Sequence, residues 1–253
     1  MKPSEERWQT IIELVTERGR VSIADLTQTL GVSEMTVRRD LAALDSEGTI
    51  RRIHGGALPA VSGSYEPPFD LRSKLRAAAK REIAALVGTM IGDGETVILD
   101  GGTTAAAIAE VLLNRDISIC TLSLRVADVL TASPAVRLMI AGGIVRPGER
   151  SLIGPAALHI FEDYRFDVYI MTVSAIQSSA GITEWNLDDT AVKRAALRAA
   201  NRCIVACDAS KFGKTAFGRI CAIDEVDTIV TDSAIDARQK SAFESVDVNF
   251  RVA

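Results

Sequence analysis

Residues 22–56 read SIADLTQTLGVSEMTVRRDLAALDSEGTIRRIHGG, and this stretch decides the fold of the first part of the chain. Ser22 with Asp25 three residues later is typical of a capping box, which begins a helix that Gly31 ends. Ser33 begins a second helix, which Gly48 ends. The apolar residues of both helices recur at helical spacing; they are Ile23, Leu26, Leu30, Val37, Leu41 and Leu44.

The neighbouring segments complete a compact module. Residues 4–18 have the period of an amphipathic helix, which Gly19 ends. In residues 49–56, polar and apolar side chains alternate before the chain turns at Gly55-Gly56, which predicts a β-hairpin. Three helices followed by a hairpin form a winged helix-turn-helix, and we assign it to residues 1–57. The third helix of such a module enters the major groove of DNA.

Candidate DNA contacts lie on that third helix and on the hairpin. Because Val37 and Leu41 face the core, Arg38 and Arg39 point away from it. One arginine can pair with guanine, while the other holds a phosphate. The alternative is that both only solvate the helix and pair with nearby acids. The expected DNA-binding residues are Ser33, Glu34, Met35, Thr36, Arg38, Arg39, Arg51, Arg52 and His54.

A different pattern begins at residue 74. Short apolar strands are expected near 96–99, 117–120, 136–140, 167–172, 203–207 and 227–231. Helices are expected between most of them, including about 74–91, 103–113 and 187–200. This alternation predicts a larger α/β domain with a parallel sheet over residues 74–253. Residues 58–73, which contain three prolines, are expected to form a linker.

One turn in this second domain indicates a ligand site. Asp100-Gly101-Gly102-Thr103-Thr104 ends a strand and opens a helix. Ligands collect at the carboxyl ends of such strands, and a helix N-terminus favours a phosphate. Asp100 would repel a phosphate, so we assign it to a sugar hydroxyl or to holding the loop. A capped turn without a ligand is the alternative.

Two further turns could lie at the same edge of the sheet. Gly142-Gly143 follows a strand, and Arg146 or Arg150 could supply charge there. Asp208 and Lys211 follow another strand, where the lysine could reach a phosphate or hydroxyl. A simple turn and a surface ion pair are the respective alternatives, and Lys193 and Arg194 are expected to form a solvated face. The expected effector-binding residues are Asp100, Gly101, Gly102, Thr103, Thr104, Gly142, Gly143, Arg150, Asp208 and Lys211.

Composition limits the class of protein. The net charge is −4, and residues 1–57 carry eight cationic and nine anionic side chains, so composition alone does not indicate DNA. No apolar stretch is long enough to span a bilayer, and the first residues lack a signal-peptide core, so we expect a cytoplasmic protein with no membrane partner. The four cysteines are not spaced for zinc, so we expect buried, reduced thiols, no metal site and no cofactor.

The chain resembles the DeoR family of bacterial sugar-catabolism repressors. The resemblance rests on Val32–Leu41 and Ile53–Ala57, and continues through Asp100–Thr104, Ala141–Gly143 and Asp208–Gly213. It implies a repressor of operator DNA whose C-terminal domain resembles ribose-phosphate isomerases and binds a sugar phosphate as inducer. Leu122 stands where family members usually carry asparagine, which removes a polar side chain from the expected site.

Two other functions compete with a ligand-controlled repressor. One is an isomerase-like enzyme acting on sugar phosphates, for which Asp208 and Lys211 are the tempting acid/base pair. The other is a DNA-binding protein whose C-terminal domain only oligomerises. Because two recognition helices are needed for repeated half-sites, we expect a homodimer or homotetramer. Sequence does not decide between repression and activation.

Overall fold

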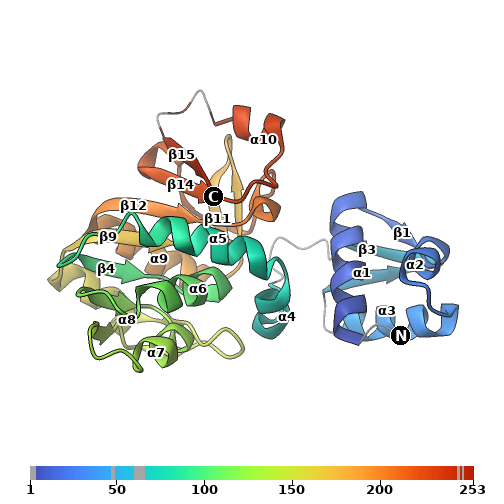
Figure 1. Cartoon of the computed structure of the whole chain (residues 1–253), viewed down its shortest axis with the longest axis horizontal. Coiled ribbons are helices and arrows are strands. Elements are labelled where there is room, and N and C mark those ends of the chain that lie inside the picture. Colours follow the sequence, from blue (N-terminus) through green and yellow to red (C-terminus); the bar gives the residue numbers. More distant parts are fainter. Residues whose placement is uncertain (1–3, 47–48, 60–65, 244–245, 247) are drawn as a thin grey trace. The chain divides into compact units, whose positions relative to one another are not determined.

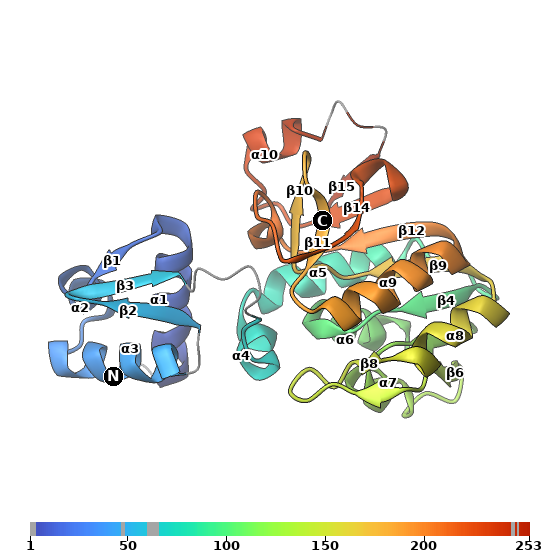
Figure 2. The same ribbon diagram turned by 180° about the vertical axis from the view of Figure 1, so that it is seen from behind.

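The computed structural model describes residues 4–46, 49–59, 66–243, 246 and 248–253. The chain divides into two compact units, Met1–Leu75 and Arg76–Ala253, which are described separately (Figures 1 and 2). The expected linker, 58–73, contains the end of strand β3 (Gly56–Pro59) and helix α4 (Phe69–Lys74), while its residues 60–65 lie outside the described residues. Gly48, the expected helix end, also lies outside them.

The first unit has the predicted winged helix-turn-helix architecture. Its helices are α1 (Ser4–Arg18), α2 (Ile23–Leu30) and α3 (Glu34–Ser46), with α4 last. Strands β1 (Val21–Ser22), β2 (Ile50–Ile53) and β3 form an antiparallel sheet in the order β1-β3-β2. Ile53 pairs with Gly56, so the hairpin turns through His54 and Gly55, and Gly55 adopts the positive φ of 81° that this turn requires.

Local signals in the sequence explain these boundaries. Ser22 and Asp25 form the predicted capping box at the start of α2, and Gly31 ends the helix in the left-handed conformation. One apolar core joins all three helices to the sheet, and Leu71 and Leu75 pack against it. Its fully covered members include Ile11, Val15, Leu26, Val37, Leu41, Leu44, Ile50 and Ala57.

The second unit is built on the predicted parallel sheet. Its seven strands lie in the order β15-β14-β12-β9-β4-β5-β6, and every adjacent pair is parallel. The strands are β4 (Thr96–Leu99), β5 (Ser118–Thr121), β6 (Arg137–Ile140), β9 (Phe166–Met171), β12 (Ala200–Ala206), β14 (Thr228–Thr231) and β15 (Asn249–Val252).

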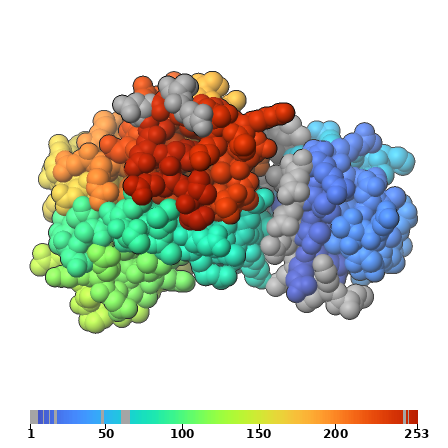
Figure 3. Space-filling model, turned by 45° about the horizontal axis from the view of Figure 1, so that its top comes forward, coloured from blue at the N-terminus to red at the C-terminus, as the bar shows by residue number. Residues whose placement is uncertain are grey.

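Helices cover both faces of this sheet. Val97 and Leu99 pack on one face with α5 (Ala77–Gly88), α6 (Gly102–Leu112) and α7 (Leu124–Leu130). Ile98 packs on the other face with α8 (Pro155–Asp163) and α9 (Leu187–Ala199). Successive strand residues point to opposite faces, so the central strands, which are covered on both faces, are mostly apolar. Figure 3 shows the C-terminal residues lying directly against α5 on one side of this unit.

Smaller elements not predicted from the sequence complete the unit. Strands β10 (Ala175–Gln177), β11 (Gly181–Glu184) and β13 (Gly218–Cys221) form an antiparallel sheet. Strands β7 (Ile144–Val145) and β8 (Leu152–Ile153) form a hairpin after β6. Two 3₁₀ turns, Ala209–Lys211 and Ile223–Glu225, and helix α10 (Ala237–Ser241) lie near the C-terminus.

Candidate functional site

Helix α3 is braced against α1 by a buried carboxylate. Asp40 accepts hydrogen bonds from the Arg7 guanidinium at 2.8 and 3.1 Å and from the Trp8 indole at 2.9 Å. This bidentate ion pair offsets the cost of desolvating the carboxylate, and it raises the pKa of Arg7. Asp40 is therefore unavailable to Arg38 and Arg39, and it fixes the orientation of α3.

The other predicted residues of α3 divide into capping and exposed groups. Ser33 accepts a hydrogen bond from the Thr36 backbone at 3.3 Å, and their hydroxyl oxygens lie 3.0 Å apart, so both are engaged in starting the helix. Met35 and Arg39 are exposed. Arg38 is exposed as well, and its guanidinium lies 3.4 Å from the Glu34 carboxylate one turn back.

The hairpin presents its cations to solvent. Arg51, Arg52 and His54 are all exposed, whereas Ile50 is buried in the core. The Arg52 amide donates to the Asp45 carboxylate at 2.8 Å, which ties the hairpin to the end of α3. The first unit thus exposes arginines on both α3 and the hairpin, and Asp45 ties these two elements together.

In the second unit, the polar groups gather at the carboxyl edge of the sheet. Asp100 follows β4, is 2% exposed, and accepts five hydrogen bonds or ion pairs. One oxygen accepts from the Gly101 amide at 2.7 Å; the other accepts from the amide and hydroxyl of Thr172, from Tyr169 and from Lys193. The Asp100 carboxylate therefore holds the turn that leads into α6.

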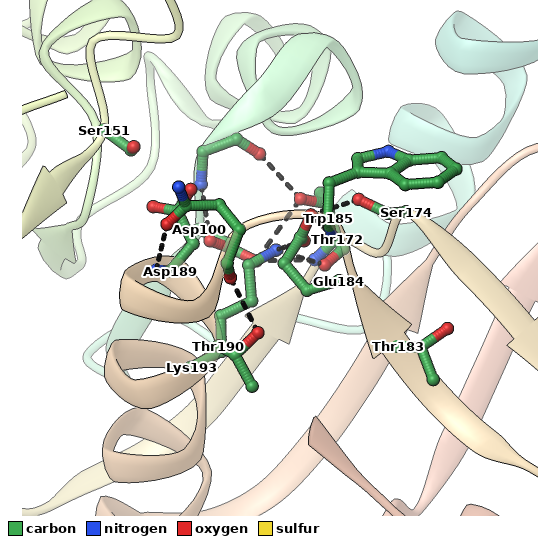
Figure 4. A network of polar contacts seen from close by, with 12 residues as sticks. Asp100, Ser151, Thr172, Ser174, Thr183, Glu184, Trp185, Asp189, Thr190 and Lys193 are labelled. Atoms are coloured by element: carbon green, nitrogen blue, oxygen red, sulfur yellow. Dashed lines mark hydrogen bonds and ion pairs between the residues drawn. The ribbon is translucent and has the colours of Figure 1, made fainter. Parts of the chain in front are cut away.

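Lys193 lies between two buried carboxylates (Figure 4). Its ammonium is 2.9 Å from Asp100 and 2.8 Å from Glu184, and it donates to the Thr172 carbonyl at 2.7 Å. Burial alone would lower the pKa of Lys193, but Asp100 and Glu184 raise it above its ordinary value, so the ammonium stays charged. The expectation that Lys193 is solvated is wrong, because α9 turns this side chain toward the sheet, where it is 7% exposed.

The same network extends to the β7–β8 hairpin. Glu184 accepts from the Trp185 amide at 2.8 Å and from the Ser174 hydroxyl. Asp189 pairs with Arg146 at 2.8 Å, and Arg146 donates to Ser151 at 3.2 Å. Burial raises the pKa of Asp189 to about 6, despite the nearby Arg146.

The structure explains why glycine is needed in the Gly142-Gly143 turn, which the sequence did not indicate. Gly143 has φ 101°, and a Cβ there would lie 2.4 Å from the Ile153 carbonyl. Glycine at this position therefore allows β7 to pack against β8. Arg150 is exposed and pairs with Asp128 of α7 at 3.1 Å, so Arg146 rather than Arg150 joins the buried network.

A second polar group lies at the ends of β12 and β14. Asp208 is buried and accepts from the Ser210 amide at 3.0 Å, with the Arg76 guanidinium 3.8 Å away. Burial would raise the pKa of Asp208, but Lys211 and Lys80 help to bring it below its ordinary value. Burial and the positive charges of Lys211 and Arg76 lower the pKa of Lys214. Arg76, Lys80, Lys211 and Lys214 are called the cationic cluster below.

Sequence reasoning missed Lys80, Arg76 and Lys193. Lys80 belongs to the buried face of α5 together with Ile83, Ala84 and Val87. A lysine in phase with an apolar helical stripe was the signal that could have found both Lys80 and Lys193. Leu122, where the family resemblance led us to expect asparagine, is 3% exposed and belongs to the apolar core.

The four cysteines lie in the core, as expected for thiols without a role in a site. All four are free and buried. Burial raises the pKa of Cys120 and that of Cys221 to about 12. Because the thiolate is the reactive form, these thiols are poor nucleophiles at neutral pH.

Comparison with known protein families assigns both units. Residues 7–61 match the DeoR-like helix-turn-helix domain, and residues 75–233 match the DeoR C-terminal sensor domain. The chain belongs to the DeoR family. This DeoR-family protein is therefore a DNA-binding transcriptional regulator with a sensor domain for a small-molecule effector, not an enzyme.

Curated relatives cover most of this DeoR-family chain. It is 36% identical to the glycerol-3-phosphate regulon repressor of Escherichia coli K12 over 90% of each chain. It is 34% identical to a putative aga operon transcriptional repressor of E. coli O157:H7, over 92% of this chain and 87% of the relative. It is also 34% identical to the transcriptional repressor CsqR of E. coli K12, over 93% of this chain and 90% of the relative.

Similarity to solved structures is weaker. Ribose 5-phosphate isomerase A from Methanocaldococcus jannaschii matches with a TM-score of 0.41 and 15% identity over 54% of each chain. Similarity at that level supports no argument about the site. Across the described residues, no helix is long and apolar enough to cross a membrane.

Proposed function

We propose that this regulator is a repressor of a carbohydrate-catabolism operon and is released from its operator by a phosphorylated sugar or polyol. The observation that carries the proposal is the cationic cluster around Asp208 at the carboxyl edge of the sensor sheet, the edge at which α6 also begins. The names of the relatives support the same class of effector, since one is named for a glycerol-3-phosphate regulon and another for the aga operon.

Two neighbouring groups could bind the two ends of such an effector. The N-cap residue of α6 is Gly101, which provides no side-chain cap, so the amides of the first turn can bind an anion. The strands before α6 and before Asp208, β4 and β12, flank β9, which separates them by two strand spacings or about 10 Å. Helix α5 packs against α6 and against β12, and it brings Lys80 to this edge.

We assign the phosphate to the first turn of α6, with Lys80 supplying positive charge, and the hydroxyl end of the effector to Asp208 and Lys211. Asp208 would then accept hydrogen bonds from the sugar hydroxyls. Asp100 already makes five contacts with four residues of the protein, so we assign it to holding the turn. Leu122 belongs to the core and offers no polar contact, so hydroxyl recognition falls to the side chains at the edge.

Operator binding requires two copies of α3. Repeated half-sites are read by symmetric oligomers, so we propose a homodimer or homotetramer in the cytoplasm. Effector binding would favour an arrangement of the two DNA-binding units that fits the half-sites less well. Such coupling amounts to about 1–3 kcal/mol in known systems.

Thermal shift of the purified full-length protein tests this function. The panel consists of sugar phosphates, polyol phosphates and their unphosphorylated parents. A phosphorylated ligand at a hundred times its Kd adds about 2.7 kcal/mol of stability. We expect the shift to disappear for the unphosphorylated parent, and to shrink strongly in Lys211→Ala and Lys80→Met.

Lys240→Ala is the matched control, because this lysine lies in α10, outside the cationic cluster. A shift that persists unchanged in both cluster variants contradicts the assigned site. A shift given equally by the unphosphorylated parents contradicts the assigned effector class. The absence of any shift across the panel favours a C-terminal domain that only oligomerises.

A further inference from the structure

The outer face of α3 carries an unusual pair of side chains. Helical residues advance by about 100° each, so Met35 and Arg39, four positions apart, share one face. That face is opposite Val37, Leu41 and Leu44, which are buried in the core. Figure 2 shows α3 along one side of the first unit, with the β2–β3 hairpin beside it. Met35 and Arg39 are thus the residues of α3 that project farthest from the protein.

Met35 is the most exposed large apolar side chain of the described residues, at 68%. It has no packing role in the unit, because α3 already buries its apolar stripe on the opposite face. A flexible, unbranched apolar side chain at the front of a recognition helix can pack against a methyl group on the floor of the major groove. Thymine is the DNA base that presents such a methyl group there.

Arg38 and Arg39 differ in their surroundings. Arg38 lies on the flank of α3 beside Glu34, with which it forms an ion pair at 3.4 Å. Among the described residues Arg39 forms no ion pair, and it lies on the same helical face as Met35. A helix of about 10–12 Å diameter fills a major groove of about 12 Å, so flanking residues meet the phosphates and outermost residues meet the bases.

Spacing along the helix fixes how far apart the two contacts fall. Four residues rise about 6 Å, and base pairs are stacked about 3.4 Å apart, so the contacts fall within two base pairs. Ala42 continues the same outer face one turn later. Its single methyl group keeps the helix close to the DNA beside Arg39.

We propose that Met35 and Arg39 are the base-reading pair of this regulator. Met35 packs against the C5 methyl of a thymine, Arg39 bonds a guanine one or two base pairs away, and Arg38 contacts a phosphate. The inference rests on the proposed function, because it requires operator DNA against α3. It adds which side chains determine the operator sequence and which chemical groups they read.

The test begins with selection of bound duplexes from a random pool by the full-length protein. In a selected duplex, each thymine is replaced singly by deoxyuridine, which removes only the C5 methyl, and each guanine by 7-deazaguanine, which removes only the N7 acceptor. Affinities are measured by fluorescence anisotropy at one fixed salt concentration, since binding to DNA depends strongly on salt. The proteins compared are wild type, Met35→Ala, Arg39→Ala and Arg38→Ala.

At one thymine per half-site, we expect deoxyuridine to weaken wild-type binding about fourfold, the value of one buried methyl group. Met35→Ala should bind the thymine and deoxyuridine duplexes equally. At a guanine within two base pairs, 7-deazaguanine should weaken the wild type about fivefold, and Arg39→Ala should no longer distinguish the two bases. Arg38→Ala should keep both discriminations, bind all duplexes more weakly, and lower the salt slope by about 1.

Met35→Ala that still discriminates thymine from deoxyuridine overturns the assignment of Met35. The assignment of Arg39 is overturned if Arg38→Ala loses the discrimination between guanine and 7-deazaguanine while Arg39→Ala keeps it. If the wild type selects a duplex but senses no thymine methyl, this inference fails while the proposed function stands. If the wild type selects no duplex at all, both fail.

Discussion

Lys193 illustrates how much one buried side chain can support at the residue scale. Its ammonium joins Asp100, which holds the turn before α6, to Glu184, which ends β11. The turn after β4 thus meets the end of β11 and helix α9, which lie more than 80 residues later, at one positive charge. Removing that charge would leave two carboxylates together in a poorly hydrated place.

We predict that Lys193→Met lowers the free energy of unfolding by about 3–5 kcal/mol, because breaking a buried ion pair leaves uncompensated charge. Urea denaturation at neutral pH measures the change. Arg198→Met is the matched control on the same helix, where an exposed side chain should cost less than about 0.5 kcal/mol. Adding Glu184→Gln to Lys193→Met should restore part of the loss; a double variant as unstable as the sum of both changes would argue against the coupling.

Asp189 makes the stability of this unit depend on pH. Burial raises its pKa to about 6 in the folded protein from 3.8, so between these values the folded state binds more protons than the unfolded state. The contribution of Asp189 to stability is therefore larger at low pH and declines as pH rises toward 6. Arg146, Lys193 and Glu184 are the charged side chains that face it: Arg146 and Lys193 favour the carboxylate form of Asp189, and Glu184 opposes it.

We predict that titration of Asp189 lowers the free energy of unfolding of the wild type by about 1 kcal/mol between pH 5 and pH 7, and that Asp189→Asn lacks this decrease. The measurement is urea denaturation of both proteins at these two pH values. Relative to wild type, the variant should be more stable at pH 7 than at pH 5. The same difference between variant and wild type at both pH values would mean that Asp189 does not titrate in this range.

At the scale of elements, the β7–β8 hairpin depends on one close approach of backbone to backbone. Gly143 adopts φ 101° and leaves room for the Ile153 carbonyl, which a Cβ would approach to 2.4 Å. The hairpin is further held by the pairing of Ser123 with Ser151 and by the ion pairs of Arg146 and Arg150. Its position at the edge of the sheet is thus fixed by packing.

We predict that Gly143→Ala destabilises the protein by about 3 kcal/mol, because it adds a steric clash to an unfavourable backbone conformation. Gly148→Ala is a well-matched control: its φ is also positive, 81°, but nothing lies within 4 Å of the added Cβ. That control should cost about 1 kcal/mol. Equal losses in the two variants, measured by thermal unfolding, would show that the clash is relieved by movement of the hairpin.

At the scale of the whole molecule, regulation requires that two separate units influence one another. Effector and operator bind to different units, so their effects must be reciprocal. If the effector weakens operator binding, the operator weakens effector binding by the same factor.

We predict a factor of about 5–150, which corresponds to the usual 1–3 kcal/mol of coupling. Isothermal titration of the compound that gives a thermal shift, with and without the selected duplex, measures one side of this cycle. Anisotropy of the duplex with and without that compound measures the other. Unequal factors from the two experiments would mean that a further species, such as a different oligomer, takes part.

The sequence by itself determined the features that depend on neighbours along the chain. The capping box at Ser22, the helical period of α3 and the turn at Gly55 are local, so the winged helix-turn-helix could be predicted nearly residue by residue. Six of the seven strands of the parallel sheet were also predicted from their apolar runs, whereas β15, the edge strand with the sequence NFRV and mostly exposed side chains, was not.

Tertiary structure decided which side chains join Asp100 and Asp208 at the edge of that sheet. The inward orientation of Lys80 and Lys193 depends on which face of α5 and of α9 meets the sheet, and a lysine on a helix is normally solvated. The sheet of β10, β11 and β13 and the role of Gly143 likewise depend on segments distant in sequence. Long-range pairing and burial, which no local pattern specifies, brought Asp100, Lys193 and Glu184 into one network.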